Sequence, residues 1–241
     1  YCRRRTSDDP RLSIHPTTSR RPLERRTWNL IMPSDNTHLV ETNRSSDLDE
    51  HESAAIDHEK AQRGVRLLLE VVGENPDRPE LAETWERRVP DVLETFSEGE
   101  RRADKPTMRT FEADSDGLIV KTSIPVYSLC EHHLLPFFGT VHLAYRPDGS
   151  VVGLSKLTRY VRWCSRQLTM QERLTNDIAS GLADELDAET VLVEMNATHL
   201  CEAMRGIETK STTTTRATVG SPTDTERERF DSAISRSEGG Q

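Results

Sequence analysis

A change of hydrophobic period restricts the fold of this chain more than any other feature. Before residue 100, apolar side chains recur at helical spacing over 51–72 and 79–97, which predicts two helices. After residue 110 the period shortens to two, which predicts β-strands, interrupted once by a second helical pair. The expected strands are 117–129, 139–146, 150–155, 190–201 and 210–220, and the second pair of helices is expected at about 155–167 and 169–186. This order predicts an α+β domain with a largely antiparallel sheet.

Local signals refine these elements. Gly73 follows the last apolar residue of the first helix and is a candidate C-cap, while Pro90 should kink or divide the second helix. The sequence Pro-Asp-Gly at 147–149 predicts a tight turn that joins two strands as a hairpin. Residues 221–241 are predominantly polar and charged, so we expect a flexible acidic tail there.

Length and charge divide the chain into one domain and two extensions. A chain of 241 residues suits a single domain with tails. The domain is expected at 51–220, with a helical segment at 51–98 and the sheet region at 110–220. Residues 1–50 should be disordered, because they lack an apolar period. The first 31 residues carry eight Arg against three acidic residues and begin with Tyr. We therefore interpret them as an artefact of a start codon assigned too far upstream, with Met32 as the true first residue.

Composition excludes two classes of partner. The net charge is −9, and without the first 31 residues it is 24 − 38, or −14. Nonspecific nucleic-acid binding needs a basic face, so we expect no nucleic-acid partner. We also expect no membrane association, because no apolar run approaches the roughly 18 residues that cross a bilayer. Four scattered Cys favour single thiols or metal ligands, which indicates a cytoplasmic protein, and the carboxylate excess suits a cytoplasm of high salt.

Cysteine and histidine residues gather in two short motifs that together predict a metal site. In the motif CEHH, Cys130 and His133 lie where one strand ends and another begins, so both can converge on one point. His199 and Cys201 lie two apart on an expected strand and therefore share a face. Two thiolates and one imidazole are one ligand short of a closed tetrahedron, which is typical of catalytic Zn²⁺. Such a set also accepts Fe²⁺.

The two motifs hold more candidate ligands than three positions need, which leaves histidines such as His132 for proton transfer. An imidazole exchanges protons near neutral pH. A metal ion held here would lower the pKa of a bound water molecule from about 15.7 towards about 7, so that it can attack an electrophilic carbon. The alternative from the residues alone is a buried cysteine beside surface histidines, with no metal.

Five motifs, in their order and spacing, resemble the zinc-dependent GTP cyclohydrolase I family: CEHHLLPFFG, GLSKLTRYV, TMQERLTNDIA, ATHLCEAMRGI and STTTT. The resemblance covers about residues 52–220. It implies hydrolysis of the imidazole ring of GTP at C8, release of formate and formation of 7,8-dihydroneopterin triphosphate. The roles that it implies are metal ligation by Cys130, His133 and Cys201, protonation of N7 by His132, and a second catalytic histidine, His199.

Glu172 has two interpretations. The resemblance implies that its carboxylate accepts hydrogen bonds from N1–H and the amino group of guanine, a bidentate contact that adenine cannot make. Spacing alone favours a capping box from Thr169 to Glu172 at the start of a helix. Gln171 corresponds to a neighbouring guanine contact in the family.

The triphosphate must be held by side chains, because the chain has no G-x4-G-K-[ST] loop. The resemblance implies phosphate contacts from Lys156, Arg159 and Arg205. It also implies a role for Ser155 in rearranging the ribose. From the residues alone, the three cations are ordinary surface charges.

The resemblance further implies the fold and the assembly. The family has the tunnelling fold (T-fold), in which antiparallel strands pair across subunits into a barrel with helices on one face. It forms a homodecamer with sites between subunits. An arginine of the family's T-P-x-R segment reaches the triphosphate of a neighbouring subunit. Here the segment reads TWERRVP, so Arg87 and Arg88 are both candidates, and Arg87 is favoured.

Two other functions fit parts of the pattern. A zinc nucleobase deaminase would carry H-x-E and P-C-x-x-C motifs, which this sequence lacks in that arrangement. A metal-stabilised module that binds a nucleotide without converting it has no use for unligated histidines such as His132 and His199. The sequence does not indicate which pathway consumes a pterin product.

Overall fold

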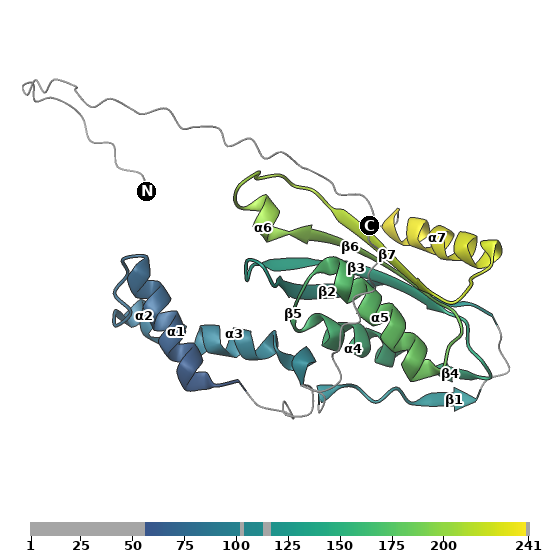
Figure 1. Ribbon diagram of the computed structural model, residues 1–241, viewed down its shortest axis with the longest axis horizontal. Helices are drawn as coiled ribbons and strands as arrows, with labels where there is room; N and C mark the ends of the chain where they lie inside the picture. Colours follow the sequence, from purple (N-terminus) through teal and green to yellow (C-terminus); the bar gives the residue numbers. More distant parts are fainter. Residues whose placement is uncertain (1–55, 102–103, 113–116, 240–241) are drawn as a thin grey trace, which may run out of the picture. The chain divides into compact units, whose positions relative to one another are not determined.

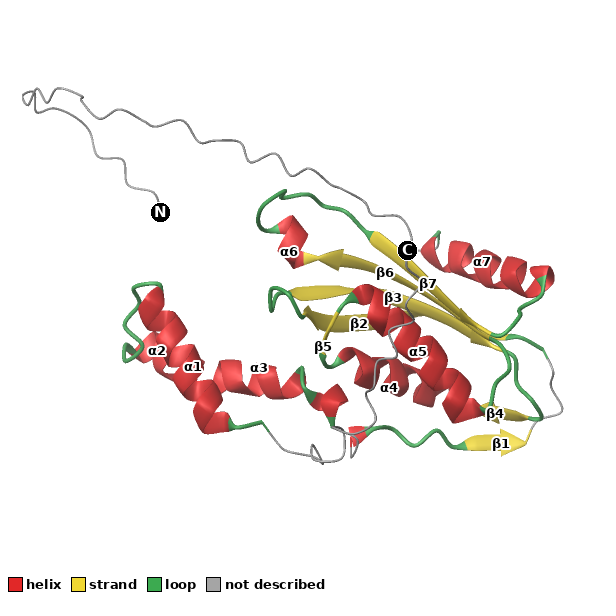
Figure 2. Cartoon of the chain, viewed as in Figure 1, coloured by secondary structure: helices red, strands yellow, loops and turns green. Residues whose placement is uncertain are grey.

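The computed structural model describes residues 56–101, 104–112 and 117–239. The disorder expected over 1–50 lies outside these residues. Figure 2 shows a mixture of helices and strands, as the periodicity predicts. In chain order the elements are α1 His58–Val71, α2 Pro79–Glu83, a π-helical segment Thr84–Arg88, α3 Val89–Thr95, a 3-10 turn Glu98–Glu100, β1 Thr110–Glu112, β2 Ile119–Cys130, β3 Pro136–Tyr145, β4 Ser150–Val152, α4 Leu154–Ser165, β5 Leu168–Thr169, α5 Gln171–Leu186, β6 Val191–His199, α6 Leu200–Ala203, β7 Thr213–Val219 and α7 Asp224–Glu238.

Five strands form the main sheet in the order β5-β2-β3-β6-β7 (Figure 1). The pairs β2/β3, β3/β6 and β6/β7 are antiparallel, which confirms the expected largely antiparallel sheet, while short β5 runs parallel to β2. The hairpin expected at 147–149 is wrong, because β4 pairs with β1 in a separate two-stranded sheet. Val152 N–H donates instead to the hydroxyl of Tyr145, 3.1 Å away, so β4 turns aside from β3.

The main core lies between the sheet and the helices α4 and α5. Alternate strand residues such as Val141, Leu143 and Val193 are at most 1% exposed and face these helices. From the helices, Leu157 of α4 and Leu174 of α5 are fully buried in the same cluster. Burying aliphatic side chains of this size stabilises the fold by about 1.5–3 kcal/mol each. The sheet and the helix pair therefore form one packed unit.

The C-terminal helix α7 covers part of the opposite face of the sheet. Its Phe230 and Ile234 pack against Ala144 and Leu192 in a second cluster. Two expectations are therefore wrong: the chain does not end in a flexible tail over 221–239, and helices do not lie on one face alone. Thr223 and Glu226 form a capping box at the start of α7, which fixes a helix whose sequence is otherwise polar.

Gly73 and Pro90 are the two residues at which the sequence predicts that a helix ends or is interrupted. Gly73 has φ of +84° just after α1, and its N–H donates to Glu70 while the next N–H donates to Leu69, which is a Schellman motif. Pro90 is buried in the first turn of α3, directly after the π-helical segment that separates α3 from α2. The backbone stays helical from Pro79 to Thr95, and the π-helical turn just before Pro90 is an irregularity within one helix, so the proline does not divide the second expected helix. Among the described residues, no helix has the length and apolar character that crossing a membrane requires.

Candidate active site

The sheet topology brings the two Cys/His motifs to the same end of the sheet, where β2 and β6 both finish. β2 and β6 both pair antiparallel to β3, so they run in the same direction and end at the same side of the sheet (Figure 1). Cys130 is the last residue of β2, His199 is the last residue of β6, and Cys201 follows in α6. Residues 70 positions apart in the chain can therefore meet without any further loop.

A tight turn then directs His133 back toward Cys130. The carbonyl of Cys130 accepts from the N–H groups of His133 at 3.3 Å and Leu134 at 2.9 Å. Leu134 has φ of +54°, a left-handed conformation that reverses the chain before β3. As a result, Nδ1 of His133 lies 3.7 Å from Sγ of Cys130.

The geometry of these three side chains fits a single divalent ion. The ligand atoms of Cys130, His133 and Cys201 all lie within 4.8 Å of one another. A tetrahedral zinc site with Zn–S of about 2.3 Å and Zn–N of about 2.0–2.1 Å would separate a sulfur from a nitrogen by about 3.6 Å. The observed 3.7 Å agrees with that separation. The expected Cys130, His133, Cys201 set is therefore brought together, and it can bind a metal ion.

The environment of Cys201 opposes loss of its thiol proton. Burial raises the pKa of Cys201, and the neighbouring Cys130 raises it further, since two thiolates repel. The guanidinium of Arg205 acts in the opposite direction and lowers the pKa of Cys201. A divalent ion bound between the sulfurs would favour both thiolates.

His132 extends away from the three ligand groups. Its side chain is 59% exposed, and its ring centre lies 6.2 Å from that of His133. Nε2 of His132 is 3.8 Å from a carboxylate oxygen of Glu131, which is itself held by Arg173 at 2.6 Å. We did not predict Glu131 and Arg173 as site residues, although each lies next to a predicted one in the sequence.

The ring of His199 makes more contacts than that of His132, and these contacts fix its orientation. Its ring stacks on Phe137 with centroids 4.7 Å apart and an interplanar angle of 10°, and its Nε2 lies 2.8 Å from Oε1 of Gln171. Burial lowers the pKa of His199, while Glu172 and Glu202 act in the opposite direction. The ring therefore favours its neutral form in a fixed orientation.

Gln171 has a different environment from the one we expected. Its side chain is 1% exposed, and its amide nitrogen donates to the carbonyls of Met195 at 3.0 Å and Thr213 at 2.9 Å. Its oxygen faces His199. The expected contact of Gln171 with guanine therefore has no support in this structure.

Glu172 is exposed at the second position of α5, and it does not cap the helix. The residue before α5, Met170, occupies the N-cap position without a side-chain hydrogen bond, and Thr169 donates to the carbonyl of Met170 at 3.3 Å. The capping box expected from Thr169 to Glu172 is therefore wrong. The carboxylate of Glu172 is close enough to His199 to raise the pKa of that imidazole, which places it beside the candidate site.

The expected phosphate-binding residues fall into two groups. Arg205 follows α6 and lies close enough to Cys201 to influence its pKa. Ser155, Lys156 and Arg159 belong to the first half of α4.

The first half of α4 lies far from the metal ligands. The C-terminal end of α4 lies near the strand ends that carry the candidate ligands, since Ser128 donates to the carbonyl of Gln167 and Thr169 pairs with Cys130. A helix of 12 residues is about 18 Å long, so its beginning lies near the opposite edge, beside β4 (Figure 1). A single copy therefore does not bring Ser155 and Lys156 together with Cys130.

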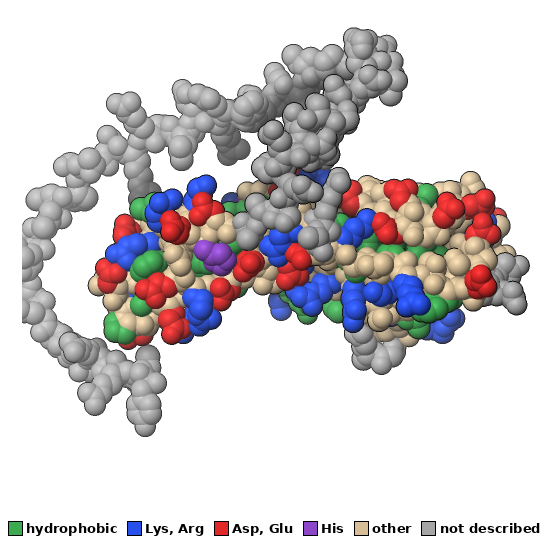
Figure 3. All heavy atoms as spheres, turned by 90° about the horizontal axis from the view of Figure 1, so that it is seen from below, with side chains coloured by type: hydrophobic (Ala, Val, Ile, Leu, Met, Phe, Trp, Pro, Cys, Tyr) green, Lys and Arg blue, Asp and Glu red, His purple; other side chains and the backbone are tan. Residues whose placement is uncertain are grey.

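Arg87 and Arg88 are exposed in the π-helical segment. Arg87 forms ion pairs with Glu83 at 3.2 Å and Asp91 at 3.3 Å, and Arg88 pairs with Glu83 at 3.0 Å. On the face shown in Figure 3, basic and acidic side chains lie side by side over this helical region. Exposed pairs of this kind contribute little, about 0–1 kcal/mol, so either arginine can exchange its partner for another anion.

Comparison with known proteins identifies the family. The family model for GTP cyclohydrolase I matches residues 61–235. The GTP cyclohydrolase 1 of Clostridium perfringens is 44% identical over 163 residues, which is 66% of this chain and 88% of that protein. The enzymes of the same name from Hyperthermus butylicus and Corynebacterium aurimucosum are 45% and 44% identical over 165 residues, which is 68% of this chain and 83% and 84% of theirs. The chain belongs to the GTP cyclohydrolase I family.

Proposed function

We propose that this chain opens the imidazole ring of GTP at C8 by hydrolysis, releases formate and forms 7,8-dihydroneopterin triphosphate. The observation that carries the proposal is the Cys130, His133 and Cys201 group, whose ligand atoms lie within 4.8 Å of one another. Two further histidines, His132 and His199, lie beside the group without belonging to it. Family membership supports the same activity.

Zn²⁺ is the metal that this donor set fits best, and Fe²⁺ is the alternative. When bound, the ion supplies activation of water for attack on C8. Three protein ligands would leave room for solvent at the ion, as catalytic zinc sites require. Cys130 and Cys201 would hold the ion as thiolates, and His133 would hold it through a neutral imidazole.

The two remaining histidines move protons. His132 donates a proton to N7 of guanine, which makes C8 a better electrophile. The carboxylate of Glu131, held by Arg173 at 2.6 Å, lies 3.8 Å from Nε2 of His132 and is the nearest polar partner that could orient this ring. His199 exchanges a proton at a second atom of the reacting ring, and its neutral form is favoured by burial.

Glu172 selects guanine. Its side chain is exposed, does not cap α5, and lies near His199, so the carboxylate is free to accept from N1–H and the amino group of the base. The side chain of Gln171, which is buried and hydrogen-bonded within the protein, makes no contact with the base.

The triphosphate is bound across subunits. Arg205 comes from the copy that supplies Cys201, whereas Lys156 and Arg159 come from a second copy, because the start of α4 lies about one helix length from the metal ligands. Ser155 accompanies them and acts in the ribose rearrangement. Arg87 of a neighbouring copy completes the phosphate contacts.

Free strand edges support assembly. In the described chain, β7 has no partner on its outer side, and β5 covers only Leu129 and Cys130 of β2. Unpaired edges of this length are normally covered. We propose that copies of the chain pair these edges into the barrel of the tunnelling fold, as a homodecamer, and that the enzymatic domain comprises residues 51–220 together with α7.

Release of formate from GTP tests the proposed function. Purified metal-loaded protein is incubated with GTP, and formate and a fluorescent oxidised pterin are measured, with ATP as the control nucleotide. We expect both products from GTP and neither from ATP. Release of ammonia without formate would indicate a deaminase, and tight binding of GTP without any product would indicate a binding module.

A further inference from the structure

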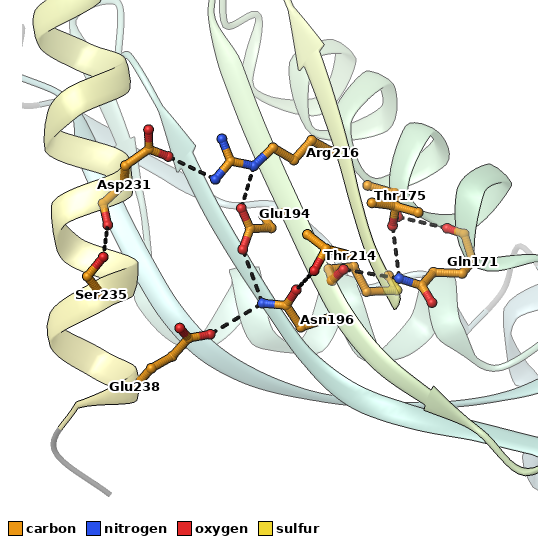
Figure 4. Close-up of polar contacts among 11 residues, drawn as sticks. Gln171, Thr175, Glu194, Asn196, Thr214, Arg216, Asp231, Ser235 and Glu238 are labelled. Carbon is orange, nitrogen blue, oxygen red and sulfur yellow. Dashed lines mark hydrogen bonds and ion pairs between the residues drawn. The ribbon is translucent and has the colours of Figure 1, made fainter. Parts of the chain in front are cut away.

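Gln171 joins His199 to β7 through a buried hydrogen-bond network. Its amide nitrogen donates to the carbonyls of Met195 and Thr213 and to Oγ1 of Thr215, at 2.9–3.1 Å. Figure 4 shows Gln171 and Thr175 side by side at the start of α5, next to β7. The threonine run at 212–215 therefore contributes polar groups to the site in addition to its suitability for a strand.

The direction of every hydrogen bond in this network is determined. Thr175 donates its hydroxyl hydrogen to the backbone carbonyl of Gln171 at 2.7 Å. Thr215, which lies 2.6 Å from Oγ1 of Thr175, must therefore donate to Thr175 and accept from Gln171. Two of the acceptors around the amide nitrogen are carbonyls, which cannot donate. The amide of Gln171 can consequently have only one orientation, with its nitrogen toward β7.

This orientation decides which nitrogen of His199 carries the proton. The oxygen of Gln171 faces Nε2 of His199 at 2.8 Å, and an amide oxygen only accepts. A neutral His199 must therefore carry its hydrogen on Nε2, which leaves Nδ1 as the ring nitrogen that can exchange a proton. Phe137, stacked on the ring, prevents the rotation that would exchange the two nitrogens.

We propose that Gln171 is a positioning residue that fixes the tautomer and orientation of His199, and that Thr215 of β7 in turn fixes Gln171. The inference rests on the proposed function for its kinetic consequence, but the tautomer itself does not depend on it. It assigns proton transfer at His199 to Nδ1. A histidine held in the wrong tautomer loses about 10⁴-fold in turnover in a well-studied triad, which sets the upper limit of the effect.

Kinetic constants separate positioning from base recognition. Gln171→Leu replaces the amide by an apolar side chain of comparable size and removes the acceptor, so kcat for formate release should fall about 100-fold while KM for GTP stays within about twofold. A contact with guanine would instead raise KM at an unchanged kcat. That second result would overturn the proposal, as would a Gln171→Leu protein with wild-type kcat.

A second variant addresses the case in which Gln171→Leu fails to fold. Thr215→Val removes one acceptor of the Gln171 amide without changing shape, and we expect kcat to fall about three- to tenfold at constant KM. Thr214→Val is the matched control, because Thr214 lies on the other face of β7 and donates to Asn196 (Figure 4). Equal kcat values in the two valine variants would refute the positioning role.

The tautomer can be measured without turnover. In metal-loaded protein labelled with ¹⁵N-histidine, solid-state nuclear magnetic resonance distinguishes a protonated from an unprotonated ring nitrogen, and His199→Asn identifies the signal. We expect His199 protonated at Nε2 in the wild type and a mixture of tautomers in Gln171→Leu. Protonation at Nδ1 alone in the wild type would refute the inference, whereas inactivity toward GTP with the expected tautomer would refute only the proposed function.

Discussion

Replacement of Glu172 by Gln separates recognition of guanine from helix capping. The structure predicts almost no effect of Glu172→Gln on stability, because Met170 occupies the N-cap position and no side chain caps α5. An exposed substitution without a structural partner changes the free energy of unfolding by about 0.5 kcal/mol or less. If Glu172 did complete a cap, its loss would cost about 0.5–2 kcal/mol.

Glu172→Gln should weaken recognition of GTP by much more free energy than it removes from the stability of the fold. A carboxylate accepts two hydrogen bonds from guanine, and bonds to a charged group contribute about 1.5–3 kcal/mol each. The amide of glutamine keeps one acceptor and turns a donor toward the second donor of the base. We therefore expect a loss of about 2–4 kcal/mol, which is a decrease of about 30- to 1,000-fold in kcat/KM, mostly through KM.

Two measurements on one preparation decide between the interpretations. We would determine kcat and KM for GTP from formate release, and the melting temperature by calorimetry. Glu228→Gln, on α7 and on the other face of the sheet, is the matched control for loss of one carboxylate. A melting temperature lower by about 2–8 °C with unchanged kcat/KM would show that Glu172 acts as a cap and would refute the guanine contact.

Three further results are expected. Cys201→Ala should lose bound metal and formate release together, whereas His132→Ala should retain metal, measured by elemental analysis, and lose ring opening by about 100-fold or more. Phe230→Ala removes a side chain of α7 that is 3% exposed and packs on the sheet, so the free energy of unfolding in urea should fall by about 3–5 kcal/mol without loss of metal. The hydrogen bonds from Arg146, together with weaker contributions from those of Thr223, lower the pKa of Glu226 to about 2 from its ordinary 4.5. The stability that this pair contributes is therefore complete above about pH 4.5 and lost as pH falls toward 2, and Arg146→Met should remove this part of the acid dependence of unfolding.

The sequence predicted most elements because their apolar periods are long and regular. β2, β3, β6, α4 and α5 all begin and end within about three residues of the expected positions. The missed helix α7 has few apolar residues, and its one clear signal, the capping box from Thr223 to Glu226, lies in a segment that its polarity suggested was a tail. The pairing of β4 with β1 joins residues about 40 positions apart in the chain, and a local turn motif cannot predict such a pairing. Cytoplasmic location and adaptation to high salt remain predictions.

A metal site at the two motifs was predictable from residue type and spacing, and the family resemblance selected its three ligands, whereas the supporting contacts were not predictable. Cys, His and Cys in a two-motif pattern indicate a metal whatever surrounds them. The environment of Gln171 depends instead on carbonyls of β6 and β7 that only the folded sheet brings near it. The same holds for Thr169 and Glu172, whose spacing fits a capping box although the backbone places the N-cap at Met170.

One chain brings the candidate metal ligands together but keeps Lys156 and Arg159, the proposed phosphate contacts, away from them. The ligands converge because β2 and β6, both antiparallel to β3, must end at the same edge. Lys156 and Arg159 begin the helix whose far end returns the chain to that edge, so the length of α4 itself keeps them away from Cys130. If their role in phosphate binding is correct, a mixture of inactive Cys201→Ala and Lys156→Ala chains should regain activity on reassembly, because some sites would then combine two intact halves. A mixture that stays inactive after exchange of subunits would refute the shared site.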